Sequence, residues 1–167
     1  MSYLTEPLNS THKKRDFNCG KKLLDDYLHT QAKQDIKRRL SACFILSGDG
    51  YSVRGYYTLS STSINRELLP EPIIKKLPPS YRNLPATLLG RLAVDSNHKG
   101  QRLGELLLLD ALKRSYEVSL SSVGSMAIIV DPLDEEAVRF YKKYGFILLP
   151  DSGKMFITMD TVSELFK

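Results

Sequence analysis

A short apolar stretch that leads through a basic, glycine-bearing turn into a leucine-rich segment most constrains how this chain can fold. Residues 89–94 read Leu-Gly-Arg-Leu-Ala-Val, residues 98–104 read His-Lys-Gly-Gln-Arg-Leu-Gly, and four leucines follow at 106–109. This order predicts a strand, a turn and the start of a helix. The first turn of a helix carries unpaired N–H groups and a partial positive charge. We therefore expect an anion site here, and the ligand that it suggests is a diphosphate.

Size and composition indicate an ordinary globular protein. The 167 residues, 42% apolar and 26% charged, predict a single domain over residues 1–167. No apolar run approaches the ~20 residues of a membrane span, and the N-terminus lacks the layout of a signal peptide, so we expect a cytoplasmic protein. Cys19 and Cys43 have no metal or redox spacing and are expected to be reduced and buried. Because the three histidines are scattered as well, we predict no metal site.

Positive charge is concentrated at the beginning of the chain. The first 40 residues hold nine Lys or Arg against five Asp or Glu, a net charge of +4, whereas the whole chain carries +5. Such an excess at one end suits a polyanionic partner, although a solvated basic face would have the same composition. Lys33 and Lys37 are one helical turn apart, with Arg38 beside them, so a helix would place both lysines on one face.

Apolar periodicity predicts a mixture of helices and strands. Apolar residues at every fourth position from 24 to 40 predict a helical region with a break near Gln31. Residues 42–46 and 53–60 predict a hairpin, and the proline-rich stretch 65–85 predicts an irregular excursion with at most a short helix. Further strands are expected at 86–94, 126–130, 146–149 and 155–159, and helices at 102–117 (leucines 103, 106, 107, 109 and 112 buried) and 134–144. The predicted class is α/β (α+β), a central sheet with helices on both faces.

The second informative segment lies at residues 134–146. Asp134 is a suitable helix N-cap, and Gly145 ends the helix. Four residues have the i, i+3, i+4, i+7 spacing of a buried helix face: Ala137, Phe140, Tyr141 and Tyr144. Core packing alone explains this pattern. A buried tyrosine still needs a partner for its hydroxyl, however, and Tyr141 would serve as a proton donor if it faced the same cleft as the helix at 102.

The order and spacing of these segments resemble the GNAT superfamily of N-acetyltransferases. The resemblance rests on Gly-Arg-Leu-Ala-Val at 90–94, the turn at 99–104 and Phe-Tyr-Lys-Lys-Tyr-Gly-Phe at 140–146. Phe-Asn-Cys-Gly at 17–20, Leu-Asp-Asp-Tyr-Leu at 24–28 and Gly-Tyr-Tyr-Thr-Leu-Ser at 55–60 extend it to the GNAT toxins of bacterial toxin–antitoxin modules. It implies the GNAT fold, a mixed, twisted sheet in which the strands at 89–94 and 126–130 splay apart to hold acetyl-CoA.

The resemblance also implies the site residues. The backbone of Leu92, Ala93 and Val94 would bind the pantetheine of acetyl-CoA, and the pyrophosphate would rest on Lys99, Gly100, Gln101, Arg102, Leu103 and Gly104. Tyr141 would be the general acid that protonates the departing thiolate, and the Val94 N–H would polarise the thioester carbonyl. No general base is evident, although Asp95 and His98 are close in sequence.

One position departs from the family pattern, which is Gln/Arg-x-x-Gly-x-Gly/Ala. Here Lys99 takes the first patterned position and Arg102 replaces the first patterned glycine. Glycine at that position lets the backbone approach a phosphate, whereas arginine adds a charge that can pair with one. The substitution can therefore change cofactor binding in either direction.

Amine chemistry favours an α-amine as the acceptor. An α-amine titrates near pH ~8 and a lysine amine near ~10.4, so an α-amine supplies the neutral nucleophile more readily. An aminoacyl-tRNA carries such an amine and is a polyanion, whose phosphates Lys33, Lys37 and Arg38 would hold. The first interpretation is an acetyl-CoA-dependent toxin that acetylates aminoacyl-tRNA and blocks translation. Its expected protein partner is a ribbon-helix-helix antitoxin, and a homodimer is a further expectation. The alternatives are a GNAT acetyltransferase of a small-molecule or protein amine, and an inactive GNAT-fold binding module.

Overall fold

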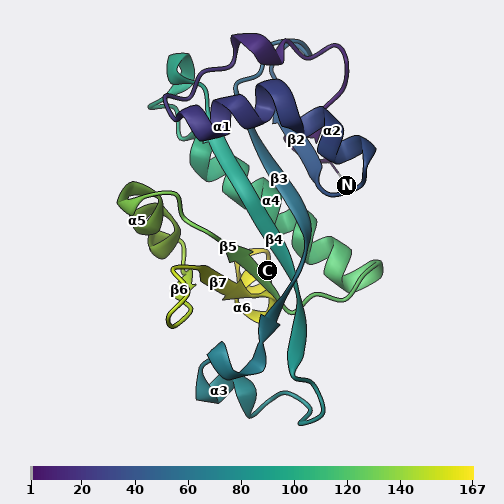
Figure 1. The fold of residues 1–167 in the computed structure, drawn as a ribbon, viewed down its shortest axis with the longest axis vertical. Helices are drawn as coiled ribbons and strands as arrows, with labels where there is room; N and C mark the ends of the chain where they lie inside the picture. The colour runs from purple at the N-terminus through teal and green to yellow at the C-terminus, as the bar shows by residue number, and fades with distance from the viewer. Residues whose placement is uncertain (1) are drawn as a thin grey trace. The chain divides into compact units, whose positions relative to one another are not determined.

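The computed structural model describes residues 2–167 and contains a seven-stranded mixed sheet in the order β1-β2-β3-β4-β5-β7-β6 (Figure 1). Its strands are β1 (Glu6–Pro7), β2 (Ala42–Leu46), β3 (Gly55–Asn65), β4 (Asn83–Val94), β5 (Ala127–Val130), β6 (Ile147–Leu148) and β7 (Met155–Thr158). Its α-helices are α1 (Lys22–Asp26), α2 (Ala32–Lys37), α3 (Glu71–Ile74), α4 (Leu103–Ser121), α5 (Glu135–Lys143) and α6 (Met159–Leu165). The chain divides into two compact units, Met1–Ser60 with Leu89–Arg114, and Ser61–Leu88 with Ser115–Lys167.

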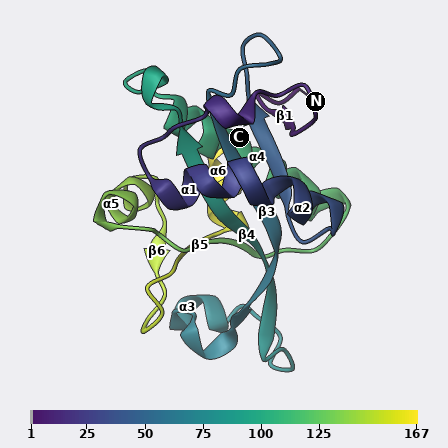
Figure 2. The same cartoon turned by 45° about the horizontal axis from the view of Figure 1, so that its top comes forward.

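In the first unit, helices cover both faces of the sheet, as the sequence predicts. Successive side chains of a strand point to opposite faces, and two buried tyrosines of β3 show this clearly. The Tyr56 hydroxyl donates to the Leu24 carbonyl of α1 at 2.6 Å, whereas the Tyr57 hydroxyl donates to Asp110 of α4 at 2.8 Å. Figure 2 shows α1 and α2 in front of β3 and β4, with α4 behind them. The predicted hairpin is confirmed, with β2 and β3 antiparallel and Leu46 opposite Gly55.

Helix α4 approaches the sheet closely because Gly55 has no side chain. A Cβ there would lie 2.7 Å from Leu107 Cδ1 and 2.9 Å from the Ala93 carbonyl oxygen. The helix extends to Ser121, beyond the predicted end at 117. The predicted burial of Leu106 is wrong, because its side chain is 39% exposed while Leu108 is fully buried. Four leucines in a row contain no periodicity, so only the packing decides which of them face the sheet.

The N-terminal helical region is divided into two α-helices near Gln31, as predicted. The division is not a break, however, because a π-helical turn, Tyr27–Gln31, joins α1 to α2. Its first residue, Tyr27, is buried, stacks on Tyr56 with ring centroids 6.5 Å apart, and donates its hydroxyl hydrogen to Asp35 at 2.8 Å. The π turn changes the pitch of the helix while these contacts are kept, and π turns occur often at functional sites.

The second unit contains the expected strand and helix around the predicted tyrosine. All four residues of β5 are buried, and β5 and β6 both pair antiparallel with β7. The Asp134 side chain accepts a hydrogen bond from the Ala137 N–H and so caps α5, as predicted. Helix α6 was not predicted, although the Thr158 side chain caps it and Val162 is buried. The two-residue strand β1 of the first unit was also missed, because it contains no alternating pattern.

Among the described residues, no helix is both long and apolar enough to cross a membrane. Cys19 and Cys43 are free and buried, as expected. Burial raises the pKa of Cys19 to about 11 and that of Cys43 to about 12, so both thiols stay protonated at neutral pH.

Candidate active site

The turn at residues 99–104 leads directly into α4. Two of its residues have a positive backbone φ, Gly100 at +85° and Arg102 at +58°. A Cβ built on Gly100 meets no atom within 4 Å, so the turn is open on that side. The first N–H groups of the 19-residue α4 have no acceptor within the helix. The turn therefore combines accessible backbone with the positive end of a long helix, which is a favourable environment for an anion.

Arg102 stands where the family pattern has glycine, and its conformation explains the pattern. A φ of +58° lies in the left-handed region, which costs a residue with a Cβ roughly 1 kcal/mol relative to glycine. The Arg102 side chain is exposed and forms no salt bridge with any other residue in the range 2–167. Its guanidinium charge is therefore available to a ligand at the turn.

The loop before the turn is held by the buried carboxylate of Asp95. Its Oδ1 accepts a hydrogen bond from the Asn18 N–H at 3.0 Å, and its Oδ2 accepts one from the Asn97 N–H at 3.1 Å. The Lys99 ammonium donates to the Cys19 carbonyl at 3.0 Å, so a neutral oxygen fixes its position without neutralising its charge. Asp95 therefore anchors the loop. The Phe-Asn-Cys-Gly motif at residues 17–20 supplies the groups that these side chains contact, the Asn18 N–H and the Cys19 carbonyl. The sequence analysis did not assign this role to the motif.

His98, the other group near the turn, also lies against Asp95. Its Nδ1 is 3.4 Å from Asp95 Oδ2 and has no hydrogen-bond partner among the described residues. No metal-binding group of three or more His, Cys, Asp or Glu occurs in residues 2–167.

The end of β4 carries the residues expected along the pantetheine. Ala93 is buried, and Leu92 and Val94 are half-buried. One residue earlier, the Arg91 guanidinium lies 3.5 Å from the centroid of the Tyr27 ring, a cation–π contact. The strand end is thus tied to the π turn of the N-terminal helical region.

Tyr141 lies on α5 and is 7% exposed. Its ring packs against Phe140 and Phe146, with centroids 5.3 and 5.2 Å away. Burial raises its pKa, so the phenol keeps its proton at neutral pH, the state that a proton donor needs. Within residues 2–167 the Tyr141 hydroxyl forms no hydrogen bond. That Tyr141 and the turn face one cleft stays a prediction.

The basic residues expected to hold substrate phosphates lie at α2. Lys33 and Lys37 are exposed on this helix, and Arg38 is its exposed C-cap. Lys33 also lines a cavity of about 340 Å³, to which Lys37 and Arg38 do not contribute. Lys14 lines the same cavity and was not singled out by the sequence analysis, because it lies before the predicted helix and has no periodic signal.

The chain is similar to one family model and to two curated relatives. The model of the acetyltransferase (GNAT) family matches residues 73–146. A tRNA-acetylating toxin of Mycobacterium tuberculosis is 37% identical over 134 residues, which cover 80% of this chain and 78% of the relative. A probable toxin TacT of Sinorhizobium fredii is 28% identical over 172 residues, covering 97% of this chain and 94% of the relative.

Solved structures of GNAT toxins share the fold over nearly the whole chain. A tyrosine-to-phenylalanine mutant of KacT superposes with a TM-score of 0.90 and 31% identity, covering 99% of this chain and 100% of the other. AtaT complexed with acetyl-methionyl-tRNAfMet has a TM-score of 0.88 and 30% identity, with the same coverage. A mutant AtaT bound to acetyl-CoA and to the C-terminus of the antitoxin AtaR has a TM-score of 0.80 and 25% identity, covering 98% and 97%.

Proposed function

We propose that this chain, which belongs to the acetyltransferase (GNAT) family, is a toxin that acetylates the α-amine of an aminoacyl-tRNA. The observation that carries the proposal is the 37% identity to a tRNA-acetylating toxin, over 80% of the chain. An acetylated amine has lost its nucleophilic lone pair to the amide, so it no longer forms a peptide bond. Modification of charged tRNA therefore blocks translation.

Acetyl-CoA suits the turn before α4 on chemical grounds. A pyrophosphate needs N–H donors and positive charge, which the start of α4 and the exposed Arg102 offer. We assign the pyrophosphate to residues 99–104 and the pantetheine to the backbone of residues 92–94. Acetyl-CoA supplies the activated acetyl group and a thiolate that can leave.

Two groups of the chain would act on the thioester, one at its carbonyl oxygen and one at its sulfur. The Val94 N–H would polarise the thioester carbonyl, which the amine nitrogen attacks. As the C–S bond breaks, the Tyr141 hydroxyl would give its proton to the departing sulfur. The new amide nitrogen would lose a proton to solvent, and the Tyr141 phenolate would take one back from solvent. We assign no general base, because Asp95 already accepts two backbone hydrogen bonds. The low pKa of an α-amine reduces the need for one.

The acceptor is tested directly by a transfer assay. The protein is incubated with labelled acetyl-CoA and a pool of charged tRNAs, and label is sought on the aminoacyl end after nuclease digestion. We expect acetyl-aminoacyl products, with no label on uncharged tRNA. If charged tRNA stays unlabelled while a polyamine or a protein lysine is acetylated well, the acceptor is another amine and the toxin proposal fails.

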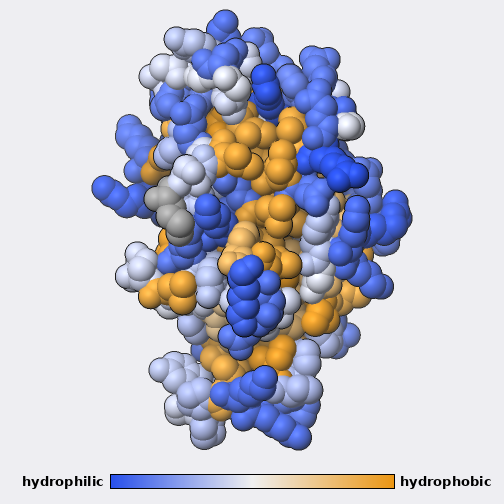
Figure 3. Space-filling model, turned by 180° about the vertical axis from the view of Figure 1, so that it is seen from behind, coloured by the Kyte–Doolittle hydropathy of each residue, from blue (hydrophilic) through white to orange (hydrophobic). Residues whose placement is uncertain are grey.

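Two kinds of partner accompany this function. Large hydrophobic side chains are exposed, Leu120, Val123, Ile147 and Leu148 among them, and hydrophobic surface is visible on the face shown in Figure 3. Such surface suits a protein partner. We propose that these partners are a ribbon-helix-helix antitoxin and a second copy of the chain. We also propose that the chain forms one catalytic domain and acts on charged tRNA in the cytoplasm.

A further inference from the structure

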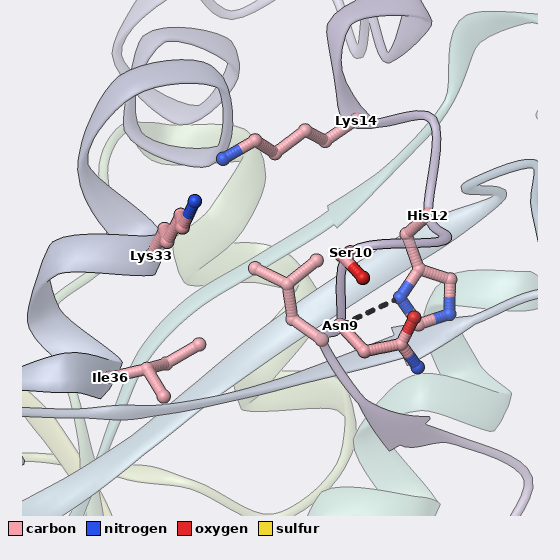
Figure 4. Close-up of a pocket in the computed structure, with 7 residues that line it drawn as sticks. Asn9, Ser10, His12, Lys14, Lys33 and Ile36 are labelled. Atoms are coloured by element: carbon pink, nitrogen blue, oxygen red, sulfur yellow. Dashed lines mark hydrogen bonds between the residues drawn. The ribbon is translucent and has the colours of Figure 1, made fainter.

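A cavity in the first unit combines two lysine ammonium groups with an apolar floor. Its volume is about 340 Å³, and the residues that line it come from the β1–Lys14 segment and from α2: Leu8, Asn9, Ser10, His12, Lys14, Lys33 and Ile36. Figure 4 shows the side chains of Lys14 and Lys33 directed toward one another from these two elements. A volume in this range is typical of a small-ligand site.

No described residue neutralises the positive charge in this cavity by an ion pair. Neither Lys14 nor Lys33 forms a salt bridge with a carboxylate of residues 2–167. Among the residues that line the cavity, His12 pairs with a carboxylate: its Nε2 donates to Glu6 Oε1 at 2.8 Å while its Nδ1 accepts from the Asn9 N–H at 3.0 Å. Both ring nitrogens of His12 are therefore occupied, and the two ammonium groups remain available to a ligand.

The other polar groups do not oppose an anion. The Asn9 side-chain oxygen accepts two hydrogen bonds from Thr11, so it is directed to its own loop. Ser10 adds a hydroxyl that can donate to a ligand. Leu8 and Ile36 form the apolar part of the lining and also pack against the hydrophobic core of this unit. The cavity therefore suits a ligand with an anionic group joined to an apolar or flat body.

We propose that this cavity binds one nucleotide of the tRNA substrate, with its phosphate between Lys14 and Lys33 and its sugar or base against Leu8 and Ile36. The inference rests on the proposed function and extends it, because it assigns a defined subsite within the basic N-terminal segment. Of the anionic partners that two lysines could hold, a nucleotide also matches the apolar floor, and the +4 charge of the first 40 residues suits the rest of a polyanion.

The first test measures binding of uncharged tRNA, which separates the cavity from catalysis. Lys14→Gln, Lys33→Gln and the double variant are compared with the parent by fluorescence anisotropy over a series of salt concentrations. We expect a higher Kd for each single variant, and for the double variant a slope of log Kd against log salt that is shallower by about one unit. Lys75→Gln is the matched control, because this exposed lysine loses the same charge outside the cavity. A double variant with the parent's Kd and slope overturns the proposal.

The second test identifies the ligand chemistry. A nucleoside 5′-monophosphate, inorganic phosphate and an acidic peptide are titrated into the protein while the Ile36 methyl and lysine side-chain NMR signals are followed. We expect the nucleotide to shift both kinds of signal, and phosphate to shift only the lysines. An acidic peptide that shifts both and displaces the nucleotide would instead assign the cavity to a protein partner.

If the parent acetylates charged tRNA but the double variant binds it unchanged, only the cavity proposal fails. If nothing is acetylated on charged tRNA, the proposed function fails while the binding result still stands.

Discussion

Replacing Arg102 by glycine should make the free protein more stable and its complex with acetyl-CoA weaker. The φ of +58° costs arginine roughly 1 kcal/mol, and glycine relieves it. Glycine also loses more backbone entropy on folding, a cost of about 0.5 kcal/mol. The net gain is about 0.5 kcal/mol, or a rise in Tm of about 1–2 °C for a chain of this size.

Binding should change in the opposite direction. The Arg102 side chain is exposed, so a contact between its guanidinium and a phosphate contributes only about 0.5–1 kcal/mol. Its loss should raise the Kd for acetyl-CoA about two- to fivefold at low salt, and the difference should shrink as salt screens the charge.

Thermal melts without ligand and calorimetric titrations with acetyl-CoA at two salt concentrations measure both effects. Arg102→Ala is the control, because it removes the charge but keeps the Cβ, so it should weaken binding without raising Tm. A glycine variant that binds acetyl-CoA more tightly than the parent would show that Arg102 obstructs the turn. A glycine variant that melts below the alanine variant would refute the strain argument.

Three further substitutions test other parts of the site. Tyr141→Phe should lower kcat and leave acetyl-CoA affinity unchanged, whereas Tyr144→Phe should change little; equal losses in steady-state assays would make Tyr141 a packing residue. Asp95→Ala should lower the free energy of unfolding by about 1–3 kcal/mol in a urea melt, because it leaves two loop amides without their acceptor; an unchanged midpoint would contradict its anchoring role. Reversing the charge of Lys33 and Lys37 together should raise KM for charged tRNA but not for acetyl-CoA, and should flatten the salt dependence of the rate; a parallel rise in both KM values would point to misfolding.

Local patterns predicted the elements whose residues carry their own signal. Helix α5 begins after Asp134 and ends before Gly145. Both ends were predictable, because an N-cap side chain and a glycine in the left-handed backbone conformation act within one turn of the helix. The β2–β3 hairpin was equally predictable from its turn. Helix α6 and the buried face of α4 were not, because a short capped segment and a run of leucines fit more than one packing arrangement.

The residues of the candidate site also fall into two groups, those that a local sequence pattern predicted and those that it did not. The anion-binding turn could be read from the order of strand, glycine and helix. The role of Asp95 could not, because its partner Asn18 lies 77 residues away in the chain. Lys14 was missed for the same reason: it meets Lys33 at a cavity only when the segment after β1 is folded against α2.

Local sequence patterns were enough to predict the acetyltransferase family, the helix N-terminus that suits a diphosphate and the position of the candidate proton donor, since each depends on residues close together in the chain. Three features became visible from the folded chain: Arg102 has a strained backbone angle, Asp95 anchors a loop, and Lys14 and Lys33, which form no salt bridge with the other described residues, share a cavity. These properties depend on backbone angles, burial and contacts between distant segments, which no local pattern encodes.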